Sequence, residues 1–187
     1  GYRLYRNPLI LLLIGPVFHF VVRQRFTQGV PKTWRKERAN VHVTNLAILG
    51  LALLMGWLVG WQNLLLIQGP VILLASSFGV WMFYVQHQYE EAYWQPHADW
   101  DYVEAALAGS SYYRLPRVLQ WFTANIGLHH LHHLDSRIPN YLLPKCLAEH
   151  PELRAERSLS LWESLSCVSL KLWDEEQGRM VGFPRSA

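Results

Sequence analysis

Residues 39–89 contain no Asp, Glu, Lys or Arg, and this uncharged segment constrains the fold more than any other feature of the sequence. A membrane-spanning helix needs about 20 consecutive apolar residues, because the hydrocarbon core of a bilayer is about 30 Å thick. The segment has room for two such helices, which we predict at residues 45–61 and 70–85. The polar and helix-breaking residues between them, Gln62 to Asn63 and Gln68 to Pro70, are typical of a tight turn. The sequence therefore predicts a transmembrane helical hairpin.

The basic residues indicate how this hairpin is oriented in the membrane. Residues 23–38 carry six Lys and Arg side chains, whereas the connection between the two predicted helices carries none. Because segments rich in Lys and Arg stay on the cytoplasmic side, we expect both outer ends of the hairpin to face the cytoplasm. The apolar run at residues 9–22 is too short to span and contains Gly15 and Pro16. We interpret it as an interfacial or re-entrant segment, with a buried helix as the alternative.

These observations predict a mainly α-helical, integral membrane protein in three parts. Residues 1–42 would form an interfacial and cytoplasmic segment, residues 43–85 two transmembrane helices, and residues 86–187 a cytoplasmic helical cap. The net charge of +3 suits a membrane surface that contains anionic lipid. The basic residues gather beside the apolar helices and no motif that reads nucleic acid is present, so nucleic acid is not expected as a partner.

Two local patterns predict structure within the cap. Asp99 and Asp101 are acidic residues of the kind that favour helix N-termini, so we expect them to begin a helix. Residues 158–177 alternate apolar and polar side chains in a mostly helical pattern, which Gly178 would end.

Four histidines lie within five residues, at His129, His130, His132 and His133. The preceding residues place apolar side chains at helical spacing from Pro116 onward, so we expect the cluster to lie on a helix. Positions 129, 132 and 133 then have the spacing i, i+3 and i+4, and three imidazoles point to one side. Neutral imidazole is a common metal ligand, so the spacing predicts a metal site. For His130 three roles stay open: a ligand, a hydrogen-bond donor to a ligand, or a surface histidine.

A further histidine, His87, follows the second predicted helix. Ionisable groups at a membrane boundary are often functional, and His87 can reach the cluster if the chain folds back. Glu90 and Glu91 follow it by three and four residues, and we interpret them as hydrogen-bond acceptors beside its ring, with a surface charge pair as the alternative. Zinc is a competing metal, but neither cysteine has the partner spacing of a structural zinc site. The remaining alternative to a metal site is a group of histidines that binds no metal.

The residues around these histidines resemble the C-terminal half of the membrane fatty acid desaturases, most closely the acyl-lipid omega-6 (delta-12 type) group. The resemblance rests on QHQYEEAYW, WDYVEAAL and NIGLHHLHHLDSRIPNYLLPKC, and its most specific part is the His-x-x-His-His motif at residues 129–133. It implies O2-dependent removal of two hydrogens from a fatty acyl chain, with electrons from a ferredoxin or a small haem protein. It also implies two iron ions at the cytoplasmic surface of the membrane, with ligands here at His87, His129, His132 and His133.

Two further histidine boxes of that family, which the resemblance places before the basic stretch, do not occur in residues 1–187, and the chain opens at Gly1 without Met. We therefore expect the C-terminal part of one desaturase domain, which supplies some of the iron ligands and is inactive alone. The resemblance favours a multi-pass protein of a bacterial inner membrane. The isolated histidines are expected to be interfacial or surface groups; they are His19, His42, His97 and His150.

Two alternative functions remain. Hydroxylases and ketolases of the same superfamily have similar iron sites and insert oxygen instead of removing hydrogen. A non-catalytic membrane protein that binds or transports metal is the second alternative, and it predicts ionisable groups inside the spans. Residues 43–85 contain neither charged residues nor histidine, which weighs against it.

Overall fold

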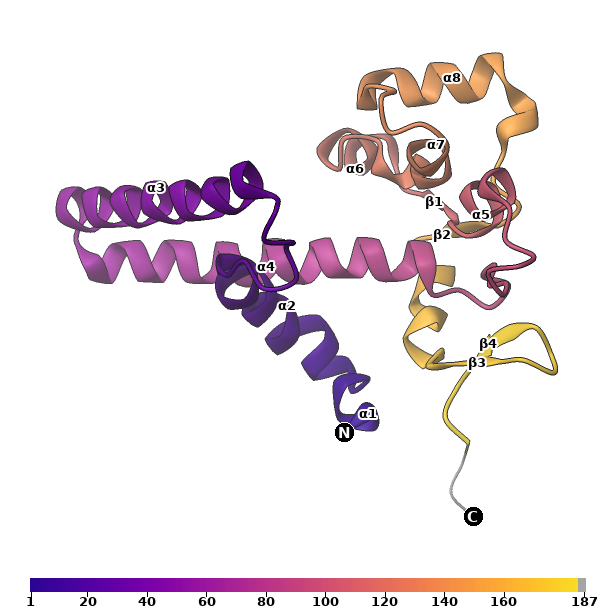
Figure 1. The fold of residues 1–187 in the computed structure, drawn as a ribbon, viewed down its shortest axis with the longest axis horizontal. Helices are drawn as coiled ribbons and strands as arrows, with labels where there is room; N and C mark the ends of the chain where they lie inside the picture. Colours follow the sequence, from indigo (N-terminus) through magenta and orange to yellow (C-terminus); the bar gives the residue numbers. More distant parts are fainter. Residues whose placement is uncertain (185–187) are drawn as a thin grey trace. The chain divides into compact units, whose positions relative to one another are not determined.

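The structure, a computed structural model, describes residues 1–184 and is mainly helical (Figure 1). The chain divides into two compact units, which we call unit 1, Gly1–Trp81, and unit 2, from Met82 onward. One long helix, α4, crosses the boundary between them, so its last turn belongs to unit 2.

Two long apolar helices dominate unit 1. Helix α3 spans Arg35–Val59 and helix α4 spans Trp61–His87, and both are long and apolar enough to cross a membrane. Almost none of their most apolar stretch is buried within the protein, which distinguishes them from core helices of a soluble domain. Residues of both helices, including Ile48 of α3 and Ile72 of α4, line one apolar cavity, so the two helices lie side by side there.

The turn between these helices is much shorter than the predicted one. Only Gly60 separates them, and its φ of +86° is a conformation that glycine adopts without strain. The predicted turn at 62–70 is wrong, because α4 continues through those residues and contains Pro70. A proline removes one hydrogen-bond donor from a helix, and apolar spanning helices tolerate that loss more often than soluble ones do.

The N-terminal segment is also helical. After the short helix α1, Tyr2–Tyr5, the chain forms a π-helical stretch at Ile10–Ile14, helix α2 at Gly15–Val17 and a second π-helical stretch at Phe18–Val22. A 3-10 turn follows at Arg23–Arg25. Gly15 and Pro16 therefore do not interrupt the helical segment. The stretches on either side of them have the wider hydrogen bonding of a π-helix, which continues the helix through these two residues. Whether this segment lies in a membrane interface remains a prediction.

Unit 2 combines short helices with two small sheets. Its helices are α5, Tyr102–Ala108; α6, Arg117–Phe122; α7, His129–Leu134; and α8, Leu143–Glu149. Its 3-10 turns lie at Ile126–Leu128, Asn140–Leu142, Pro151–Leu153 and Glu163–Ser169. Its strands are β1, Tyr112–Arg114; β2, Ser158–Ser160; β3, Leu172–Asp174; and β4, Arg179–Val181. Strands β1 and β2 pair in parallel, and β3 and β4 form an antiparallel hairpin.

The core of unit 2 lies behind α7. Leu128, Leu131 and Leu143 form a buried cluster, and Leu131 of α7 is fully buried. One face of this short helix is therefore fixed in the core. The side chains on the opposite face are not needed for core packing and can form a site. The predicted helix start is confirmed for Asp101, whose carboxylate accepts a hydrogen bond from the Glu104 backbone N–H at the start of α5, whereas Asp99 lies in a turn before the helix.

The predicted helix at 158–177 is wrong. Short strands and a 3-10 turn occupy that segment, and Gly178, with a φ of +60°, turns β3 into β4. The Asp174 carboxylate accepts hydrogen bonds from the backbone N–H groups of Glu176 and Gln177, which stabilises the turn. The strands depend on partners elsewhere in the chain, such as β1, which local periodicity does not report.

Candidate metal centre

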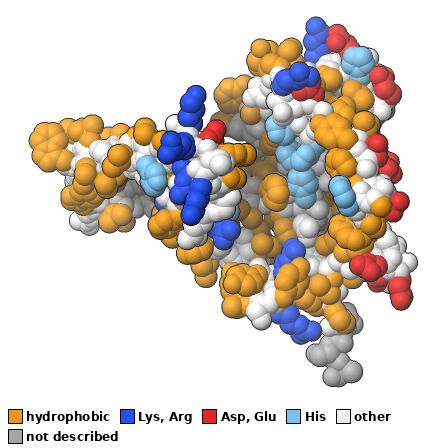
Figure 2. Space-filling view, in the orientation of Figure 1, with side chains coloured by type: hydrophobic (Ala, Val, Ile, Leu, Met, Phe, Trp, Pro, Cys, Tyr) orange, Lys and Arg blue, Asp and Glu red, His pale blue; other side chains and the backbone are white. Residues whose placement is uncertain are grey.

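Three histidine side chains converge in unit 2. His87 is the last residue of α4, and His129 and His133 lie one helical turn apart on α7. The Nε2 atom of His87 lies 3.0 Å from Nε2 of His129 and 3.4 Å from Nε2 of His133. Their potential ligand atoms all lie within 4.8 Å of one another. We call these three residues the histidine cluster; Figure 2 shows histidine side chains gathered on the surface of unit 2.

The local fold of α7 explains how His129 and His133 come to face His87. The predicted continuous helix from Pro116 is broken, because Ala124 and Asn125 both adopt positive φ angles, of 54° and 55°. This left-handed turn ends α6 and lets α7 begin in a new direction at His129. With Leu131 anchored in the core, residues 129 and 133 stack on the opposite side at i, i+4 spacing.

Hydrogen bonds orient two parts of the cluster. The ring nitrogen Nδ1 of His87 lies 3.2 Å from the carbonyl oxygen of Gly109, to which it can donate its proton. A ring protonated at Nδ1 presents the lone pair of Nε2 to the other two histidines. The Tyr102 hydroxyl of α5 donates to the backbone carbonyls of His133 and Leu134, at 2.8 and 2.9 Å, and so fixes the end of α7.

The spacing of the ring nitrogens suits a metal ion. Metal–imidazole bonds of about 2.1 Å, the length found for zinc, place two ligand nitrogens about 3.0 Å apart at a right angle and about 3.4 Å apart at the tetrahedral angle. The two Nε2 distances from His87 match these values. The donor set of the cluster is purely imidazole nitrogen, which suits iron, zinc or copper.

Burial keeps the two α7 members of the cluster neutral. It lowers the pKa of His129 to about 3, and the neighbouring histidines lower this pKa further. Burial also lowers the pKa of His133, with smaller contributions from His87 and His132. Neutral imidazoles keep the lone pairs that metal binding requires, so no proton has to leave them at pH 7.

The other two histidines of the sequence motif lie outside the cluster. The ring of His132 stacks on that of His129 with centroids 5.6 Å apart, and it lines a separate cavity of about 560 Å³. His130 is fully buried near the Tyr112 ring, and its closest backbone partner is Leu153. Burial lowers the pKa of His130 to about 4.

Glu90 and Glu91 do not contact the His87 ring. The Glu90 carboxylate forms an ion pair with Arg179 at 2.5 Å, and the Glu91 carboxylate pairs with Arg157 at 3.5 Å. The acceptor beside His87 is instead the Gly109 carbonyl. Neither Gly109 nor Tyr102 leaves a pattern in the sequence, because their roles depend on tertiary contacts.

A cavity opens beside the histidine cluster. It has a volume of about 400 Å³ and is lined by His87 and His133 together with the aromatic side chains of Tyr93, Trp94 and Trp100. We call it the histidine cavity. Its size and its mixture of aromatic walls with a few polar groups are typical of a small-molecule site.

Comparisons with known proteins identify a family and a relative of this chain. The family model for fatty acid desaturases matches residues 2–165. A protein from Bacillus subtilis strain 168 named fatty acid desaturase is 46% identical over 183 residues, which cover 98% of this chain and 51% of that relative. The chain therefore spans about half the length of the curated relative it matches.

Proposed function

The chain belongs to the fatty acid desaturase family, and we propose that it forms part of a membrane acyl desaturase in which histidines hold two iron ions. The proposed reaction removes two hydrogens from neighbouring carbons of an acyl chain, with O2 as the oxidant and electrons from a ferredoxin or a small haem protein. The observation that carries the proposal is the convergence of the three ring nitrogens of the histidine cluster.

The residues present fit the proposed metal. His87, His129 and His133 would hold one iron, and the exposed side of the cluster, at His133, faces a cavity that can admit substrate. His132 stacks on His129 but is not among the three histidines whose ligand atoms converge, so we propose that it serves the second iron. The family's other two histidine boxes, absent from residues 1–187, would supply further ligands. Bound iron would supply the oxidising power, together with O2, that breaking an unactivated C–H bond requires.

The surrounding residues would orient the ligands and the substrate. The Gly109 carbonyl holds the proton on Nδ1 of His87, and Tyr102 fixes the end of α7. The aromatic walls of the histidine cavity, Trp94 and Trp100 among them, would hold the methylene groups of an acyl chain and exclude water from His133.

The membrane arrangement is part of the same proposal. We propose that α3 and α4 cross the membrane as a hairpin and that the basic residues at 23–38 and unit 2 lie in the cytoplasm of a bacterium. Their length and apolar composition support this arrangement. Both units would belong to one partial desaturase domain, since the family match at residues 2–165 extends across the boundary between them.

Metal binding by the chain tests the ligand assignment directly. Titration of the detergent-solubilised chain with Co²⁺, followed by visible absorption, should show a site that His129→Ala and His133→Ala abolish. His150→Ala is the matched control, because His150 pairs with Glu152 outside the cluster and should leave binding unchanged. Unchanged Co²⁺ affinity in both cluster variants would contradict the assignment.

The reaction itself needs a second experiment. The chain can be fused to the part of the Bacillus subtilis relative that it does not match, and the fatty acids of cells expressing the fusion analysed by gas chromatography. A new double bond that His133→Ala removes is the expected result. A new hydroxyl or ketone group would instead establish an oxygen-inserting activity.

A further inference from the structure

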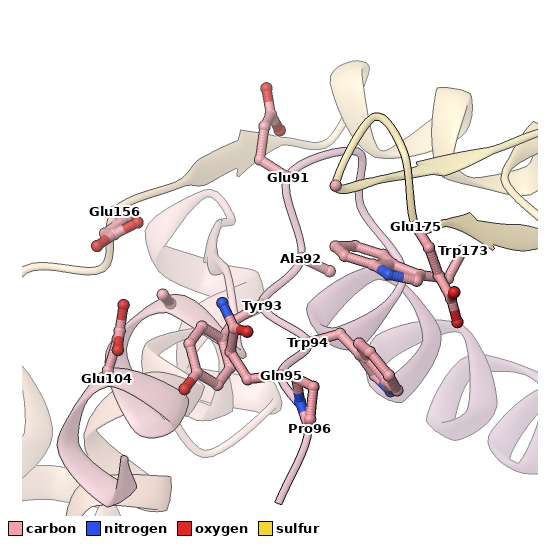
Figure 3. Close-up of a pocket in the computed structure, with 12 residues that line it drawn as sticks. Glu91, Ala92, Tyr93, Trp94, Gln95, Pro96, Glu104, Glu156, Trp173 and Glu175 are labelled. Carbon is pink, nitrogen blue, oxygen red and sulfur yellow. The ribbon is translucent and has the colours of Figure 1, made fainter. Parts of the chain in front are cut away.

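A second cavity of unit 2 adjoins the histidine cavity. It has a volume of about 610 Å³, and Tyr93, Trp94 and Gln95 line both cavities. Because the two share these wall residues, one elongated molecule can place one part beside His133 and another part in the larger cavity. Figure 3 shows the larger cavity, which we call the acidic cavity.

The charge of this cavity is strongly negative. Figure 3 shows Glu104 and Glu156 on one side of it and Glu175 on the other. None of these three carboxylates forms an ion pair with any residue that the structure describes. Glu91, which also lines the cavity, is already paired with Arg157. A cation bound here would therefore meet carboxylates that no protein group neutralises.

Aromatic rings supply the rest of the recognition. Trp94 and Trp173 both line the acidic cavity, with ring centroids 6.1 Å apart and planes inclined by 41°. The face of an indole attracts organic cations, and several rings with nearby carboxylates are the usual surroundings of a bound alkylammonium group. Acyl carriers with several phosphates and a net negative charge would instead be repelled by the three glutamates, whereas in a zwitterionic headgroup the ammonium offsets the single phosphate.

We propose that the acidic cavity binds the ammonium headgroup of a lipid whose acyl chain reaches His87 and His133 through the histidine cavity. The inference rests on the proposed function and names its substrate class, an acyl lipid with a cationic headgroup nitrogen. The shared wall of Tyr93 to Gln95 favours a substrate over a lysine of a partner protein, because it joins the cation site to the place where the acyl chain would lie.

The test compares two short lipids that differ only in their headgroups. Dihexanoyl phosphatidylethanolamine and dihexanoyl phosphatidylglycerol are titrated into the detergent-solubilised chain, and their Kd values are measured by calorimetry. The ethanolamine lipid should bind about tenfold more tightly, as expected for an ammonium group among aromatic rings and partly exposed carboxylates. Equal affinities would overturn the proposal.

Variants that remove the charge of the glutamates test whether the headgroup preference arises in the acidic cavity. Glu104→Gln, Glu156→Gln and Glu175→Gln combined should bring the ratio of the two Kd values to about one, and each single variant should lower it two- to threefold. The charge-matched control, which should keep the full ratio, combines substitutions outside the cavity: Glu149→Gln, Glu152→Gln and Glu176→Gln. A ratio that survives in the triple cavity variant would overturn the proposal, and the single variants decide the matter if the triple variant does not fold.

Two further arms separate the possible outcomes. A tetralysine peptide that binds more tightly than the ethanolamine lipid, and depends on the same glutamates, would assign the cavity to a protein partner and overturn the lipid proposal. His129→Ala should abolish Co²⁺ binding but leave the headgroup preference unchanged. Failure of the proposed function would therefore appear in the metal titration, and failure of this inference in the lipid titration.

Discussion

The side-chain amide of Gln86 donates a hydrogen bond to the backbone carbonyl of Ile126 over 2.6 Å. Gln86 is almost fully buried and directly precedes His87, and Ile126 begins the 3-10 turn that leads into α7. This bond therefore ties the helix that carries one member of the histidine cluster to the segment that positions the other two.

Replacing Gln86 with Leu should weaken both the fold and the metal site. The change removes the donor and leaves the Ile126 carbonyl without this partner, at a cost of about 1–3 kcal/mol in the free energy of unfolding. Co²⁺ affinity should fall with it. Thermal unfolding followed by circular dichroism and Co²⁺ titration measure the two effects. Gln62→Leu, at an exposed position of α4, is the control, and equal behaviour of the two variants would contradict the role of Gln86.

Tyr102→Phe should loosen the end of α7 without unfolding unit 2. The Tyr102 hydroxyl donates to two carbonyls that have no partner within their own helix, and it is partly exposed. We expect a loss of about 0.5–1.5 kcal/mol in the free energy of unfolding and a several-fold weaker Co²⁺ affinity. Tyr141→Phe is the matched control, because the Tyr141 side chain is 71% exposed. A Tyr102→Phe chain with unchanged Co²⁺ affinity would show that this hydroxyl does not position His133.

The two cysteines should differ sharply in reactivity. Burial raises the pKa of the Cys167 thiol to about 11, whereas Cys146 is only partly buried. At pH 8 about 0.1% of a thiol with that pKa is thiolate, the form that reacts. Maleimide should therefore label Cys146 alone in the native chain at pH 8, and the rate at Cys167 should rise with each pH unit towards 11. Mass spectrometry of peptides measures both rates, and rapid labelling of Cys167 at pH 8 would contradict the burial.

The proposed hairpin predicts which side of the membrane each turn reaches. In a Cys146→Ser background, Asn63→Cys lies beside the Gly60 turn and should react with a membrane-impermeant maleimide added to intact cells. Lys32→Cys, within the basic stretch, should react only after the inner membrane is opened. Labelling of Lys32→Cys in intact cells would reverse the proposed orientation.

The sequence predicts those features that depend on composition or on short-range spacing. The uncharged run predicted two long apolar helices, and the i, i+4 spacing placed His129 and His133 together. The position of the interhelical turn was wrong because Pro70 and the polar residues near it fit inside a helix, while Gly60 alone reverses the chain. Position 132 also has helical spacing, but its ring lies on the flank of a six-residue helix.

Features that depend on distant contacts could not be predicted in this way. The parallel pairing of Tyr113 with Leu159 and the contact between His87 and Gly109 join residues whose local sequence gives no indication of a partner. The hydrogen bond from Gln86 to Ile126 is of the same kind, since it joins residues 40 positions apart. Tyr93 and Trp94 entered the sequence analysis only as part of a family motif, which did not indicate that they line a cavity.

Helix α4 runs without a break from Trp61 to His87. An unbroken α-helix advances by about 1.5 Å and rotates by about 100° for each residue. Val85 and Gln86, the two residues before His87, are buried, and Gln86 is hydrogen-bonded within unit 2. A single alanine inserted between Gly69 and Gly79 would therefore turn the preceding part of α4 by about 100° about its axis and leave His87 beside His129 and His133. The contacts of the last turn of α4 with Ile126 and Gly109, and not the length of the helix before it, decide where the His87 side chain points.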